Sequence, residues 1–123
     1  MTNAQTMAQD VKTIFAGIDT LDPANFVRHL TEDVVFQFGN NDPVVGRDAV
    51  AEGVRGFYTT IAGMRHDVRQ VYVDGDIAIA KVDIVYTRLD GKSVTVPNAD
   101  ILTFEGDKVR DWRIYIDLTP VYA

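Results

Sequence analysis

The spacing of the apolar residues changes partway along this 123-residue sequence, and this change constrains the fold more than any other feature. In the first half, apolar residues recur at intervals of three and four, as they do on one face of a helix. The first such series is Met7, Val11, Ile14, Phe15 and Ile18. From Met64 onward, apolar and polar residues alternate, which is typical of strands. Helices followed by a run of strands predict an α+β fold with the helices packed on one face of a sheet.

The same patterns predict where the elements lie. Helices are expected over about 7–18, 23–30 and 47–61, the second of them capped by Asp22 with Pro23 in its first turn. Strands are expected over about 34–38, 64–73, 77–88, 93–104 and 109–118. Short glycine-containing turns separate the last four strands, so the sheet should be mostly antiparallel. We expect this sheet to curve and to enclose a pocket with the helices.

Length and composition predict a single domain that spans residues 1–123. The chain is 46% hydrophobic, has no cysteine and carries a formal net charge of -6. The absence of cysteine excludes a disulfide scaffold, thiolate catalysis and cysteine-based metal sites. The negative charge argues against binding to nucleic acids or to anionic membranes. Since no apolar run is long enough to span a bilayer and no signal peptide is visible, we expect a soluble, cytoplasmic protein.

Four polar residues of two predicted strands are expected to share one face of the sheet. If Asp90-Gly91 is a two-residue turn, Lys81 lies opposite Asp100 and Asp83 lies opposite Asn98. The opposite face is then the apolar one: Val82, Ile84, Tyr86, Ala99 and Ile101. Either the polar face meets water and the apolar face packs on the helices, or the polar face lines a pocket and a second subunit covers the apolar face. The pattern alone favours the first arrangement, because charged residues are seldom buried unless paired.

The turn before these strands leaves two registers open. If Gly75-Asp76 is a two-residue loop, Val68 opposes Asp83, and His66 lies diagonally from Asp83 on the polar face. A loop one residue longer would instead place three charged side chains there: Arg65, Asp67 and Arg69. We favour the shorter loop, because it gives an apolar interior set: Met64, Val68 and Tyr72.

The last strand needs an irregularity if it is to contribute to the pocket. Trp112, Ile114 and Ile116 alternate with polar residues along it. For Trp112 to share a face with Asp100, the turn around Gly106 must contain an extra residue, such as a bulge.

Several short strings, in their order and spacing, resemble the nuclear-transport-factor-2-like superfamily, and its SnoaL-like branch in particular. They are Leu30-Thr31-Glu32-Asp33-Val34-Val35-Phe36, Gly46-Arg47-Asp48-Ala49-Val50, Asp90-Gly91-Lys92 and Trp112-Arg113. The resemblance covers nearly the whole chain and implies the cone-shaped α+β fold of ketosteroid isomerases, polyketide cyclases and limonene-epoxide hydrolases. In that fold the concave face of the sheet lines a ligand cavity and the outer face often forms a dimer. The resemblance therefore implies that the polar face lines the pocket and that a homodimer forms through Val82, Ile84 and Tyr86.

The catalytic residues of these relatives are incomplete here. Lys81 and Asp83 resemble the Arg–Asp pair of the epoxide hydrolases, but Ile114 replaces their second aspartate, and Phe36 and Phe38 replace their Tyr and Asn. This departure does not support limonene-type epoxide hydrolysis.

The steroid-isomerase set is incomplete as well. Asp100 falls on the oxyanion-hole aspartate of the ketosteroid isomerases, whereas Ile14 stands in the place of their tyrosine. The position of their base falls at Phe38 or Gly39, so steroid isomerisation by those residues is not supported either.

We expect an enzyme that performs acid–base chemistry without a cofactor or a metal. Such an isomerase, cyclase or lyase would act on a small hydrophobic carbonyl compound, like a polyketide or steroid, with Asp100, Asp83 and His66 as the catalytic residues. The expected substrate-binding residues are Lys81, Asn98, Trp112, Phe36, Phe38, Phe57, Tyr58 and Ile114. The alternative is a non-catalytic ligand-binding or dimerisation domain, in which Asp100 forms a salt bridge with Lys81. No P-loop or serine-nucleophile motif is present.

Overall fold

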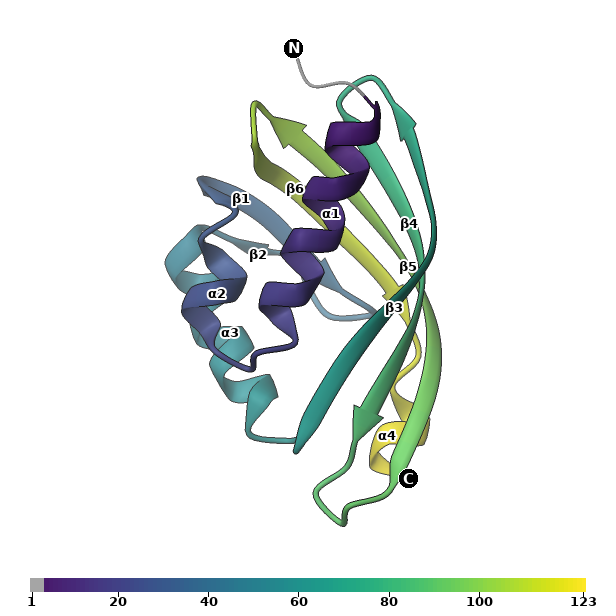
Figure 1. Cartoon of the computed structure of the whole chain (residues 1–123). Coiled ribbons are helices and arrows are strands. Elements are labelled where there is room, and N and C mark those ends of the chain that lie inside the picture. Colours follow the sequence, from purple (N-terminus) through teal and green to yellow (C-terminus); the bar gives the residue numbers. More distant parts are fainter. Residues whose placement is uncertain (1–3) are drawn as a thin grey trace.

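A curved six-stranded sheet with helices on its concave side organises the chain (Figure 1). The computed structural model describes residues 4–123. Its helices are α1 (Ala4–Ile18), α2 (Pro23–Val27), α3 (Arg47–Tyr58) and α4 (Thr119–Tyr122). Its strands are β1 (Leu30–Phe38), β2 (Val44–Val45), β3 (Gly63–Asp74), β4 (Ile77–Thr87), β5 (Ser93–Glu105) and β6 (Lys108–Ile116), in the order β2-β1-β6-β5-β4-β3. The predicted α+β class is confirmed, and all pairs in the sheet are antiparallel except β1–β6.

The helices form where the sequence predicts them. The apolar face of α1, from Met7 to Ile18, is buried and packs across β3 and β4. Helix α2 begins as expected, because the Asp22 side chain accepts a hydrogen bond from the Ala24 amide at 3.0 Å. Differences are confined to short segments: α2 ends at Val27, β1 begins already at Leu30, and the short elements β2 and α4 were not predicted. None of the helices within residues 4–123 is long and apolar enough to cross a membrane.

The loop between β4 and β5 is one residue longer than predicted. The Arg88 amide donates to the Lys92 carbonyl at 2.8 Å, which leaves three residues, Leu89 to Gly91, in the loop. Gly91 lies in the left-handed region with φ 87°, the conformation that closes a three-residue hairpin loop. The predicted two-residue turn is therefore wrong.

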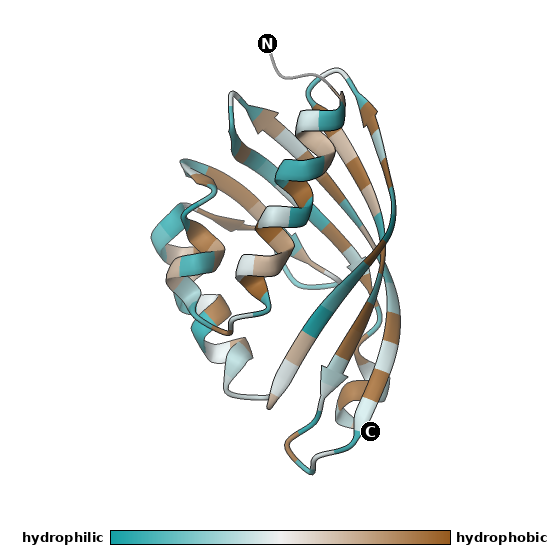
Figure 2. Ribbon diagram, in the orientation of Figure 1, coloured by the Kyte–Doolittle hydropathy of each residue, from teal (hydrophilic) through white to brown (hydrophobic). Residues whose placement is uncertain are grey.

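This longer loop shifts the β4–β5 register by one residue, which turns every side chain of one strand to the other face. Asp100 pairs with Ala80 and Asn98 with Val82, so the expected pairs Lys81–Asp100 and Asp83–Asn98 do not exist. Lys81 and Asp83 alternate along β4 with the buried Val82, so they point to the outer face, away from the helices. Figure 2 shows alternating apolar and polar bands along the strands of the sheet.

The same shift overturns the expected dimer face. Val82, Ile84 and Tyr86 are buried beneath the helices rather than exposed on the outside of the sheet. The outer face instead carries Tyr72 and Ile79, which pair with each other across β3 and β4.

A bulge in β3 combines features of the two registers that the sequence left open. Next to the turn, Asp74 pairs with Ile77, which confirms the two-residue loop. The register then shifts between Val68 and Gln70, so that His66 pairs with Ile84. The expected pair Val68–Asp83 is wrong, because the bulge at Arg69 adds one residue to β3. As a result His66 faces the interior, whereas Tyr72 is 58% exposed on the outer face.

The irregularity expected in the last hairpin is present. Phe104 pairs with Val109 but Thr103 pairs with Asp111, so Arg110 is the extra residue of a bulge. This bulge places Trp112 opposite Leu102, on the same face as Asp100. The prediction that a bulge brings Trp112 and Asp100 to one face is confirmed.

Candidate functional site

A cavity of about 1080 Å³ lies between the concave face of the sheet and the helices. Most of the residues predicted to bind a ligand line it: Phe36, Phe38, Phe57, Tyr58, Asn98, Trp112 and Ile114. His66 and Asp100 line it as well, whereas Lys81 and Asp83 do not. A mainly apolar cavity with a few convergent polar groups is typical of a site for a small molecule.

Aromatic side chains form much of the cavity wall. The ring of Trp112 is fully buried and stacks on Phe26 at a centroid distance of 5.2 Å, while Phe36 meets it edge-on at 5.6 Å. Phe38 and Phe57 also line the cavity, and their ring centroids lie 5.4 Å apart. These rings give the cavity a rigid apolar surface that suits a hydrophobic ligand.

Asp100 is the one carboxylate among the described residues that is almost fully buried, with 1% of its surface exposed. It lies on β5 between Ala80 and Ile114. Trp112 Nε1 donates to its Oδ1 at 3.3 Å, and Asn98 Nδ2 donates to its Oδ2 at 3.5 Å. Burial raises the pKa of Asp100 to about 6, because a charged carboxylate is poorly solvated there, although His66, Trp112 and Asn98 partly oppose the shift.

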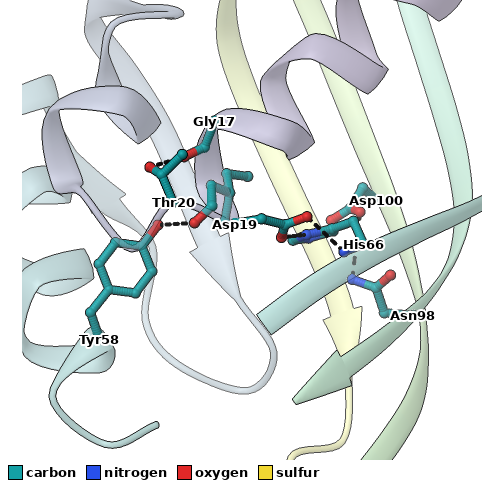
Figure 3. A network of polar contacts seen from close by, with 8 residues as sticks. Gly17, Asp19, Thr20, Tyr58, His66, Asn98 and Asp100 are labelled. Carbon is teal, nitrogen blue, oxygen red and sulfur yellow. Dashed lines mark hydrogen bonds and ion pairs between the residues drawn. The ribbon is translucent and has the colours of Figure 1, made fainter. Parts of the chain in front are cut away.

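His66 is held by a carboxylate that follows the end of α1. Its Nδ1 lies 2.6 Å from Asp19 Oδ1, and its backbone amide donates to Asp19 Oδ2 at 2.9 Å (Figure 3). The imidazole also stacks on Phe15 at 4.6 Å with an interplanar angle of 7°. With a carboxylate at Nδ1, that nitrogen carries the proton and Nε2 is the acceptor of the neutral ring. The ring is therefore fixed both in orientation and in tautomer.

Tyr58 fixes the segment that carries Asp19. Its hydroxyl donates to the Ile18 carbonyl at 2.9 Å, joining the end of α3 to the end of α1. The Thr20 hydroxyl donates to the Gly17 carbonyl at 2.7 Å and closes the turn that follows α1 (Figure 3). Burial raises the pKa of Tyr58, so this hydroxyl stays protonated and acts as a support for the site.

Residues 11–112 match the model of the SnoaL-like domain. The chain belongs to the SnoaL-like family.

Solved structures share the fold of this SnoaL-like domain at low sequence identity. An NTF2-like protein of unknown function from Burkholderia pseudomallei is 19% identical, with a TM-score of 0.83 over 94% of this chain and 97% of that one. A protein with a ketosteroid-isomerase-like fold from Catenulispora acidiphila, in complex with trimethylamine, is 16% identical, with a TM-score of 0.83 over 92% and 88%. The epoxide hydrolase/cyclase-like enzyme SalBIII, which has a role in pyran ring formation in the polyether salinomycin, is 18% identical, with a TM-score of 0.82 over 97% and 96%. At such identities the likeness concerns the fold alone.

Two residues expected in the site of this SnoaL-like domain lie outside it. Asp83 forms an ion pair with Arg69 on the outer face, where Arg69 Nε lies 2.9 Å from its Oδ2. Lys81 is exposed on that face and pairs across the sheet with Ala99. The physical reason is the β4–β5 register, which separates both side chains from Asp100 by the thickness of the sheet. The proposed salt bridge between Lys81 and Asp100 is therefore wrong.

Asp19 is the site residue that the sequence did not reveal. It follows the last apolar residue of α1, just before the N-cap Asp22, so it lies outside any periodic pattern. Its partner His66 is 47 residues away in the chain, and only the packing of α1 on β3 brings the two together. Within residues 4–123, no group of three or more His, Cys, Asp and Glu side chains is placed to hold a metal ion.

Proposed function

We propose that this SnoaL-like domain catalyses proton transfer on a small hydrophobic ketone, as an isomerase or cyclase does, with Asp19, His66 and Asp100 as its working groups. The observation that carries the proposal is the arrangement of a buried carboxyl group and an imidazole held by a carboxylate at one apolar cavity. Two titratable groups with different environments at one site are typical of acid–base catalysis.

The roles follow from the hydrogen bonds. His66 Nε2 takes a proton from the carbon next to the carbonyl, and the electrons of the broken C–H bond form the C=C bond of an enol. Asp100, in its protonated form, donates its proton to the carbonyl oxygen. Asp19 stabilises the imidazolium that forms, through the proton on Nδ1. The imidazolium then returns its proton to a carbon and Asp100 recovers its proton from the enol, so the net change is an isomerisation.

The test uses 2-tetralone, a bicyclic ketone with acidic protons next to its carbonyl. Exchange of these protons in D₂O is followed by proton NMR, with and without the protein. We expect the protein to accelerate exchange, and we expect His66→Gln and Asp100→Asn each to reduce the acceleration by about 100-fold or more. Asp74→Asn is the matched control, because it removes one exposed carboxylate at the end of β3 without touching the cavity. Exchange no faster than in buffer, or equal rates for all variants, would refute the proposal.

The second candidate function is ligand binding without turnover. One observation favours it: both Asp100 oxygens already accept hydrogen bonds and almost none of the residue is exposed, which is also typical of a structural group. Binding of 2-tetralone without accelerated exchange would support this alternative.

A further inference from the structure

Tyr86 presents a buried hydroxyl that nothing within residues 4–123 satisfies. The residue lies on the inner face of β4, is 0% exposed and lines the same cavity as Asp100. Among the described residues, its hydroxyl oxygen has no hydrogen-bond partner. Buried hydroxyls are nearly always paired, and the neighbouring Tyr58 and Trp112 follow this rule by donating to Ile18 and Asp100. The unpaired hydroxyl of Tyr86 therefore requires an explanation.

Asn98 presents the complementary case, an unpaired acceptor. Its Oδ1 is buried and without a partner among residues 4–123, although its Nδ2 faces Asp100 Oδ2 at 3.5 Å. Turning the amide over would bring Oδ1 against the Asp100 carboxylate. Both groups are hydrogen-bond acceptors, so they would repel each other. Above about pH 6, where Asp100 is mainly charged, the carboxylate therefore holds the amide in the orientation that leaves Oδ1 free.

The two unpaired atoms belong to residues that are offset along the sheet. Asn98 pairs with Val82, which precedes Tyr86 by four residues on β4. Four residues span about 13 Å along a strand, so the backbone positions of Asn98 and Tyr86 are offset by that length. A donor and an acceptor on residues offset in this way suit one molecule that carries two separate oxygen functions.

The charges around Tyr86 define what its hydroxyl can bind. Burial raises the pKa of Tyr86, and the negative charges of Asp100 and Asp19 raise it further, as do Tyr58 and Tyr122. The hydroxyl therefore remains a neutral donor. An anionic oxygen would be repelled by the same carboxylates, whereas an uncharged ketone or ether oxygen would not.

We propose that Tyr86 and Asn98 select the ligand: the Tyr86 hydroxyl donates to an uncharged carbonyl or ether oxygen, and Asn98 Oδ1 accepts from a hydroxyl group at the other end of the same molecule. The hydroxyl group of Tyr86 is enclosed by protein atoms in this structure, so a neighbouring side chain moves aside when a ligand binds. Phe57 is the ring that packs edge-on against Tyr86, at 6.2 Å, and it too lines the cavity. This inference rests on the proposed function only in using the same cavity, because it concerns recognition and not turnover.

The test compares the binding of three bicyclic probes by calorimetry. They are 6-hydroxy-2-tetralone, which has both oxygen functions, 2-tetralone, which lacks the hydroxyl, and 6-hydroxytetralin, which lacks the ketone. We expect Tyr86→Phe to weaken binding of the two ketones about fivefold and to leave 6-hydroxytetralin unchanged. We expect Asn98→Leu to weaken the two hydroxyl-bearing probes by a similar factor and to leave 2-tetralone unchanged. Tyr72→Phe, which removes the same atom on the outer face, is the matched control.

Three outcomes would overturn the inference. The first is that Tyr86→Phe binds the ketones as tightly as the natural protein does, or that it loses affinity equally for all three probes. The second is that 6-hydroxy-2-tetralone does not bind at millimolar concentration. The third concerns the empty protein: Tyr86→Phe should unfold at the same urea concentration or a higher one, because the lost hydroxyl had no partner. A lower midpoint would mean that the hydroxyl is paired. Binding with the expected pattern but without proton exchange would refute the proposed function and leave this inference standing.

Discussion

Asp100 should make the stability of this protein fall as the pH rises through the weakly acidic range. Its pKa rises from an ordinary value of 3.8 to about 6 on folding, because the folded protein solvates the carboxylate poorly. Between these two values the folded protein binds the proton that the unfolded chain has already released. The contribution of Asp100 to the free energy of unfolding is therefore fully present below about pH 3.8 and is lost as the pH rises through about 6.

The size of the effect follows from the shift. A difference of about 2 pKa units corresponds to about 3 kcal/mol in total. Most of this loss falls within an experimentally convenient range, since about 2 kcal/mol disappears between about pH 4.5 and about pH 7.5.

The assay is urea denaturation of the natural protein and of Asp100→Asn at several values of pH across that range. Asparagine keeps the shape of the side chain but does not titrate, so the difference in unfolding free energy between the two proteins isolates Asp100. Relative to Asp100→Asn, the natural protein should lose about 2 kcal/mol from the lowest to the highest pH. Asp74→Asn supplies the charge-matched control. A difference between the natural protein and Asp100→Asn that is constant with pH would refute the argument from burial.

Three further outcomes are expected. Trp112→Phe removes the indole donor 3.3 Å from Asp100, which should raise the pKa of that carboxyl further, as measured by carbon NMR of the labelled side chain; an unchanged or lower pKa would contradict this. Gly17→Ala should destabilise the protein by about 1–3 kcal/mol in urea denaturation, because the added Cβ would lie 2.8 Å from a backbone oxygen of α2. Gly56→Ala in α3 is the control: its Cβ meets no atom within 4 Å, so it should stabilise the protein by about 0.5 kcal/mol. Equal effects of the two substitutions on the unfolding free energy would refute the clash at Gly17. The outer face of the sheet, which exposes Tyr72 and Ile79, should form a homodimer. Light scattering at micromolar concentration should show a dimer, and Ile79→Glu should dissociate it. A monomeric natural protein would rule out this interface.

The sequence predicted the elements well because their signals are local. The helical spacing from Met7 to Ile18 and the cap at Asp22 act within a few residues, and the structure confirms both. The bulge before Trp112 could also be predicted, since one turn length and one shared face require it. Phe57 lies on the helical stripe that the spacing predicts, whereas the apolar wall to which Phe36 and Phe57 contribute is an implication of the family resemblance.

The composition of the site depends on strand register, because a shift of one residue turns the side chains of a strand to the other face of the sheet. A glycine-containing turn such as Asp90-Gly91 fits a loop of two or of three residues, and the two choices give opposite faces to Lys81 and Asp100. The bulge at Arg69 acts in the same way on β3 and brings His66 inside. Such choices are decided by the packing energy of the whole sheet against the helices, which no local string of residues expresses.

The sequence by itself determined the fold family, the order of helices and strands, and the presence of an acidic residue, Asp100, on a central strand. Only the tertiary structure decided the partners of that residue and the composition of the site. Asp19 joins His66 because α1 packs across β3. Tyr86 shares the inner face of the sheet with Asp100 because the β4–β5 loop has three residues. Periodicity shows which residues can share a face, whereas the pairing of distant segments shows which residues meet.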